Sequence, residues 1–216
     1  MLLGGCGLFN SHAAYRFRMT VEAQTPQGVV RGETVSEVRA EKNNTKILAE
    51  ERAGGSAVFG EAIVLEMANG PIFVLMKVPP KRESLQRVVT QAFKPGTPLG
   101  GVANFFPAVQ SLGAWFSGSV KAELPRRDWP IMVRFRDLND PKSIEQVDPD
   151  AIGVKHIQIE TTSDDISTGI AKRFPPWFAA MVRSKTALDG RTSSVVFTND
   201  LMDTMSPSSF STELYR

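Results

Sequence analysis

The chain has 216 residues, of which 42% are hydrophobic and 22% are charged, and these proportions exclude an intrinsically disordered protein. The 25 basic and 23 acidic residues are mixed along the sequence and give a formal net charge of +2, so no field strong enough to attract nucleic acid is expected. A single cysteine excludes an intrachain disulfide, and no apolar run reaches the roughly 18 residues that a membrane-spanning helix requires.

The first feature in chain order lies at the N-terminus. The sole cysteine, Cys6, follows Leu3 and two glycines, and this order of residues resembles the box at which bacterial lipoproteins are cleaved and lipidated. Only two residues precede the box, whereas such a signal carries a basic region and an apolar region there. We therefore expect Cys6 to carry lipid if the sequence begins inside a signal, with residues 1–14 as signal remnant and tether. The alternative is an ordinary, frayed N-terminus.

Alternating apolar and polar residues predict antiparallel strands in the first third of the chain. The alternation is clearest at residues 15–22, where Tyr15 and Phe17 begin one apolar side and Arg16 and Arg18 begin the polar side. Further strand-like segments, separated by turn residues at 25–28 and 69–70, occupy residues 29–41, 56–67 and 72–76. We expect residues 15–78 to form a meander of about four strands.

Helical periodicity and shorter strands follow. Residues 84–93 place apolar side chains at the spacing of an amphipathic helix. The aromatic-rich segment 102–116 is predicted as a buried or surface-lying helix or loop. The remaining expected elements are strands at 131–136, 154–161 and 193–198, a helix at 166–174 and a short helical turn at 177–183. Together these elements predict an α+β fold, an antiparallel sheet with a few covering helices, in one domain over residues 15–202 with a C-terminal tail at 203–216.

The sequence indicates no catalytic residue, cofactor site or metal site. His156 shares its side of a predicted strand with polar residues, so we expect it on the solvent-facing side, and His12 lies in the expected tether. One structured histidine excludes a zinc site with several histidine ligands. The carboxylates between Asp137 and Asp150 lack the spacing of a calcium-binding loop, and Asp140 and Asp148 precede prolines, as is typical of turns.

Three motifs in the C-terminal half, VRFRDLNDPK at 133–142, VDPD at 147–150 and IAKRFPPW at 170–177, accompany YRFRMTVE at 15–22. Together they resemble a group of uncharacterised proteobacterial proteins, many of which carry an N-terminal export or lipoprotein signal. The resemblance covers most of the chain. It implies a location in the cell envelope and no particular activity.

These observations leave three hypotheses about function. The leading one is a cell-envelope lipoprotein, anchored to the membrane through Cys6, that acts as a binding or interaction module, with an envelope protein as its expected partner. The second is a small hydrolase, cytoplasmic or periplasmic, that uses carboxylates between Asp137 and Asp150 or His156. The third is a structural protein that docks through the aromatic side chains of residues 102–116.

Overall fold

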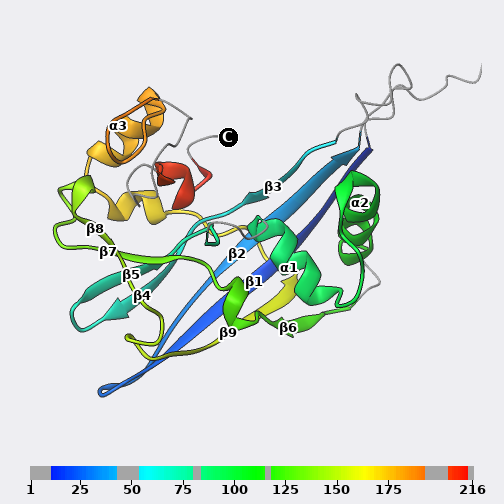
Figure 1. The fold of residues 1–216 in the computed structure, drawn as a ribbon, viewed down its shortest axis with the longest axis horizontal. Helices are drawn as coiled ribbons and strands as arrows, with labels where there is room; N and C mark the ends of the chain where they lie inside the picture. Colours follow the sequence, from blue (N-terminus) through cyan, green and yellow to red (C-terminus); the bar gives the residue numbers. More distant parts are fainter. Residues whose placement is uncertain (1–10, 43–53, 80–83, 115–117, 193–203, 214–216) are drawn as a thin grey trace, which may run out of the picture.

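The computed structural model describes residues 11–42, 54–79, 84–114, 118–192 and 204–213. These residues form two antiparallel sheets and three α-helices, which confirms the expected α+β class (Figure 1). Cys6, Trp115, Phe116 and the strand expected at 193–198 lie outside the described residues.

The larger sheet has five strands in the order β3-β2-β1-β9-β6. Its centre is a long hairpin, β1 (Ser11–Thr25) and β2 (Gly28–Lys42), that turns at the predicted position, since Thr25 pairs with Gly28. The other three strands are β3 (Ser56–Phe59), β6 (Lys121–Glu123) and β9 (Val154–Thr162). Because β1 begins at Ser11, residues 11–14 belong to the sheet and not to a tether.

The smaller sheet has four strands in the order β4-β5-β7-β8: β4 (Ile63–Met67), β5 (Gly70–Val74), β7 (Met132–Phe135) and β8 (Ile144–Gln146). The predicted single meander is therefore wrong, because residues 56–67 form two strands in different sheets. After Phe59, at the end of β3, the chain leaves the five-stranded sheet. Just beyond it, Glu61 accepts a hydrogen bond from the Ile170 N–H, and the Ala62 N–H donates to the Phe210 carbonyl. Those bonds direct β4 towards the C-terminal part of the chain.

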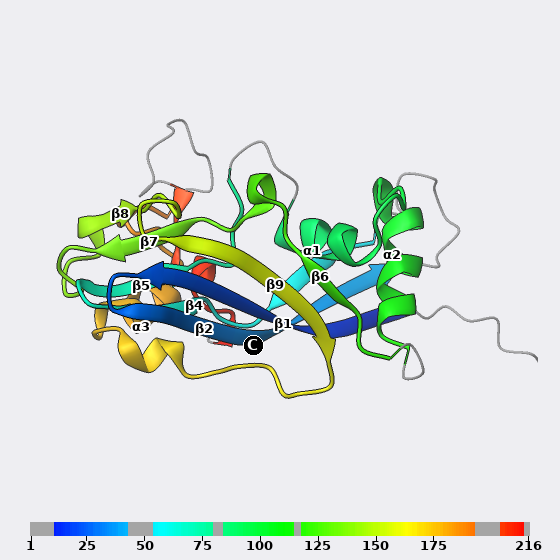
Figure 2. The ribbon, with the colours of Figure 1, turned by 90° about the horizontal axis from the view of Figure 1, so that it is seen from below.

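One face of the five-stranded sheet, which we call the inner face, is covered by a pair of helices at one end and by the four-stranded sheet at the other (Figure 2). The predicted amphipathic helix is confirmed as α1 (Leu85–Phe93), and it covers one end of this face with α2 (Gly101–Leu112). The four-stranded sheet covers the other end. The far side of that smaller sheet packs against the C-terminal part of the chain, which contains the 3-10 helix Ile170–Arg173, α3 (Trp177–Ser184) and the 3-10 helix Pro207–Ser209. Two further 3-10 helices occupy Arg126–Asp128 and Pro141–Ser143.

The helix predicted at residues 166–174 is wrong except for its last turn. Residues 163–169, which we call the strap, run without helix along the outer face of the five-stranded sheet, from the end of β9 towards α3 (Figure 2). The Ser167 N–H donates to the Val35 carbonyl at 3.0 Å, and the Val35 N–H donates to the Ser167 hydroxyl at 2.9 Å. These strand-like bonds to β2 replace the intrahelical bonds that the local sequence suggested.

The prediction of a C-terminal tail at residues 203–216 is also wrong, because residues 204–213 contribute to the core. Met205 and Phe210 are fully buried against the four-stranded sheet. The hypothesis that the aromatic side chains of residues 102–116 dock a partner is wrong for two of them. Phe105 and Phe106 on α2 are buried and therefore unavailable to a partner.

Tyr15 is buried in the larger core, and its hydroxyl shares a 2.7 Å hydrogen bond with the Thr90 hydroxyl. Burial raises the pKa of Tyr15 well above its ordinary value. The folded state therefore holds the phenol proton after the unfolded state has lost it, and this favours unfolding only above about pH 10.

We expect the free energy of unfolding to fall by about 1.4 kcal/mol per pH unit as the pH rises above about 10. Tyr15→Phe should lose this dependence, at a cost of about 1 kcal/mol at pH 7 for the lost hydrogen bond. Urea denaturation at pH 7 to 11.5 measures both effects. Equal alkaline slopes for the two proteins would contradict the assignment.

Candidate functional site

The outer face of the five-stranded sheet carries a network of charged side chains. β1 presents Arg16 and Arg18 on this face, as its alternation predicted, and β2 and β9 place Glu37 and Glu160 beside them. The Arg16 Nε donates to Glu37 at 3.0 Å, while Arg18 forms an ion pair with Glu33. The arginines of this network remain partly exposed, whereas Glu37 is buried between Arg16 and Arg39, each of which donates to it.

The strap adds carboxylates to the same network. Arg16 donates to the Asp164 carbonyl at 3.0 Å and to the Asp165 carboxylate at 3.1 Å, and Arg18 forms an ion pair with the Asp164 carboxylate. The two guanidinium groups therefore hold the beginning of the strap against β1. Both strap carboxylates face solvent, and the Asp165 side chain is fully exposed.

An open groove of about 750 Å³ lies beside this network, and we call it the β1 groove. It is bounded by the first half of β1, the C-terminal end of α2 and the end of β9. Its polar lining comprises Arg16, Arg18, Glu37, Ser119, Glu160, Thr161, Thr162, Ser163 and Asp164. Among the described residues that line the groove, Arg16 and Arg18 are the only cations, and each side chain is about one third exposed.

The carboxylates of the groove are held in the ionised form. Hydrogen bonds from Ser119 and Lys121 place the pKa of Glu160 below its ordinary value. Burial acts to raise the pKa of Glu37, but hydrogen bonds from Arg16 and Arg39 outweigh it and leave that pKa lowered as well. A carboxylate with a lowered pKa is a poor proton acceptor at neutral pH, so this site is suited to recognising charge and not to general acid–base catalysis.

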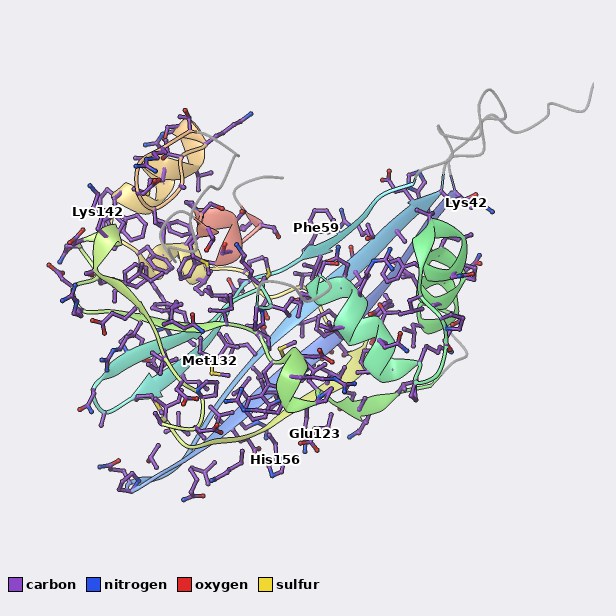
Figure 3. The ribbon with its side chains drawn as sticks, viewed as in Figure 1. Lys42, Phe59, Glu123, Met132, Lys142 and His156 are labelled. Atoms are coloured by element: carbon purple, nitrogen blue, oxygen red, sulfur yellow. The ribbon has the colours of Figure 1, made fainter. Side chains whose placement is uncertain are left out.

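His156 lies on the solvent-facing side of β9, which confirms its predicted position. Its Nδ1 is 2.9 Å from the Glu123 carboxylate on β6, and both side chains are more than half exposed (Figure 3). Glu123 also lines a shallow second hollow of about 550 Å³ with Arg126, Trp129 and Asp150. The carboxylate beside His156 is therefore Glu123, which lies outside the candidate stretch Asp137–Asp150, and His156 itself does not line the hollow. Among the described residues that line the hollow there is no serine, threonine or cysteine.

Three of the aspartates between Asp137 and Asp150 stabilise local turns, whereas Glu145 lies on β8 and forms ion pairs with Arg134 and Arg136. Asp137, Asp140 and Asp148 each accept a hydrogen bond from the backbone N–H two residues later. These three side chains are exposed. Within the described part of the chain, no group of three or more histidine, cysteine or acidic side chains could hold a metal ion.

Sequence reasoning missed a second pair of carboxylates, at the end of the strap. Glu61 accepts the Ile170 N–H at 2.7 Å, and Glu213 accepts the Gly169 N–H at 3.0 Å. Burial is the largest cause that raises the pKa of Glu61, and the nearby charge of Glu213 adds to it. Since each carboxylate has a backbone donor at the start of a 3-10 helix, their role is to fix the strap to the core. The two residues are 152 positions apart in the sequence, so no local pattern could have indicated the pair.

Comparison with known proteins gives no match to a family model, a curated protein or a solved structure. None of the helices in the described ranges has the length and apolar character needed to cross a membrane.

Proposed function

We propose that this protein is a non-catalytic binding protein of the bacterial cell envelope and that the β1 groove is its ligand site. The observation that carries the proposal is the pair of neighbouring guanidinium groups, Arg16 and Arg18, at the groove wall. The hydrolase alternative receives less support, because His156 is exposed on a strand and the four aspartates between residues 137 and 150 are exposed as well.

The chemistry of the groove favours a ligand with a carboxylate or phosphate group. Guanidinium groups bind such anions through paired, charge-assisted hydrogen bonds. In the free protein, Asp164 and Asp165 occupy these donors, and both lie on the exposed strap. An anionic ligand would take their place at Arg16 and Arg18, while Glu37 stays bound to Arg16 from within the sheet.

Inorganic phosphate is a suitable probe of this site. We expect it to shift the side-chain Nε–Hε resonances of Arg16 and Arg18 in a saturable manner in NMR titrations. Asp164→Asn should strengthen phosphate binding several-fold, because it removes the competing carboxylate. The double variant Arg16→Gln/Arg18→Gln should not bind phosphate. It should still fold, because Arg39 continues to donate to the buried Glu37 carboxylate at 2.6 Å and the other ion pairs that are lost are largely exposed.

Asp148→Asn is the matched control, since Asp148 is also an exposed carboxylate paired with an arginine, Arg126, but lies outside the groove. Its phosphate affinity should equal that of the wild type. Shifts that do not saturate, or an equal gain in the two asparagine variants, would refute the groove as an anion site.

The envelope location rests on the lipoprotein-like box that ends at Cys6. A gene with an in-frame upstream segment that encodes a basic and apolar signal is expected. In bacteria that express the chain with a complete signal, we expect palmitate to label the protein and Cys6→Ser to abolish the label. An in-frame stop codon directly upstream, or a label that survives Cys6→Ser, would refute the anchor.

A further inference from the structure

The longest uncharged stretch of the sequence coincides with one exposed helix. Between Lys94 and Lys121 the chain contains no aspartate, glutamate, lysine, arginine or histidine. α2 lies within this stretch and buries Phe105, Phe106 and Val109 against the sheet. The solvent-facing side of α2 is formed by Gly101, Ala103, Asn104, Pro107, Gln110 and Ser111.

The uncharged side of α2 contrasts with the outer face of the five-stranded sheet, which carries several ion pairs. Burying a charged side chain in an interface costs free energy unless it is paired, and interface centres are accordingly depleted of charge. No charged side chain would have to be desolvated to cover the exposed side of α2.

The position of α2 relative to the chain start indicates what covers it. The C-terminal end of α2 contacts the beginning of β1, where Gly113 lies directly against the Ala14 carbonyl. Lys42, at the end of β2, lies at the same end of the molecule (Figure 3). Since β1 begins at Ser11, five residues after Cys6, a lipid on Cys6 could be no more than about 17 Å from the sheet.

We infer that the uncharged side of α2 is the surface through which this protein rests on a phospholipid bilayer. This inference rests on the proposed lipid anchor at Cys6. The short connection keeps the domain at the bilayer, and it brings the end that carries Ser11 and α2 nearest to it. α3 lies at the opposite end of the molecule and points away from the membrane (Figure 1).

The test uses the fact that Cys6 is the only cysteine. The thiol of Cys6 in the full chain is coupled to a maleimide phospholipid in nanodiscs of phosphatidylcholine and phosphatidylglycerol that contain a nitroxide-headgroup lipid. We expect the amide resonances of α2 to be broadened several-fold more than those of α3. Equal broadening of the two helices, or stronger broadening of α3, would overturn the inference.

A matched pair of variants separates contact from mere proximity. Ala103 on α2 and Ala180 on α3 are both exposed helical alanines. Ala103→Glu should reduce the broadening of α2 several-fold, because its charge is repelled by phosphatidylglycerol, whereas Ala180→Glu should leave it unchanged. Equal effects of the two variants would also overturn the inference.

Because the lipid is attached chemically, the result does not depend on whether bacteria lipidate Cys6. Failure of palmitate labelling in cells would refute the anchor. Failure of the α2 broadening would refute the membrane-facing surface.

Discussion

Phe210→Ala is expected to lower the free energy of unfolding by about 3–5 kcal/mol, the usual cost of deleting a buried aromatic ring. The Phe210 ring is fully buried, and its centroid is 5.2 Å from that of Phe174 and 5.8 Å from that of Phe73. The side chain therefore joins the four-stranded sheet to the segment that precedes α3. Urea or guanidinium denaturation at pH 7 measures the loss.

Val29→Ala is the control for this prediction. Val29 lies at the start of β2 with 63% of its surface exposed, so its truncation should change the free energy of unfolding by less than about 0.5 kcal/mol. If Phe210→Ala cost as little as Val29→Ala, residues 204–213 would not be part of the core.

Gly32→Ala should destabilise the protein by about 1–3 kcal/mol, although alanine is normally the less costly residue in a strand. Gly32 lies in the first half of β2, on the face that meets the four-stranded sheet. A Cβ atom there would be 2.6 Å from both the Ile63 Cγ2 and the Val64 carbonyl oxygen of β4. Because one of these atoms belongs to the backbone, β4 itself would have to move.

Gly55→Ala provides the comparison, since a Cβ atom at Gly55 would meet no atom within 4 Å. That variant should be neutral or gain up to about 1 kcal/mol from the smaller entropy of its unfolded state. Thermal denaturation of the two variants gives the difference directly. An equal change in both would show that β4 does not approach β2 as closely as the structure has it.

Local patterns predicted those elements whose stability depends on one buried face. The alternation at Tyr15 and Phe17 predicted a strand with one buried face, and the structure confirms it as β1. The helical spacing at residues 84–93 predicted an amphipathic helix, and the structure confirms it as α1. The two sheets could not be separated in the same way. Residues 56–67 place Ala57, Phe59, Ile63, Leu65 and Met67 on one side, as a single strand would. The break at Glu61 depends on bonds to Ile170 and Phe210, which lie far away in the sequence.

The same limit applies to the strap and to the candidate site. Ser163, Asp164 and Asp165 are good helix N-cap residues, but in the fold the two aspartates pair with arginines on β1. The sequence did place Arg16 and Arg18 on the solvent-facing side of a strand. It could not show that the end of β9 lies beside Arg16 and Arg18 and helps to form the β1 groove. That arrangement depends on the pairing of β1 with β9, which joins residues more than 140 positions apart.

The central position of β1 determines when this sheet can be completed. β1 pairs on one side with the adjacent β2, but its other partner, β9, begins only at Val154. Until that part of the chain is available, β1 has a long unpaired edge, and such edges favour association between chains. Contacts this distant in sequence also slow folding. The chain therefore cannot complete its larger sheet stepwise from the N-terminus. The free edge of β1 has to avoid association with other chains until about three quarters of the chain, up to the end of β9, is available to fold.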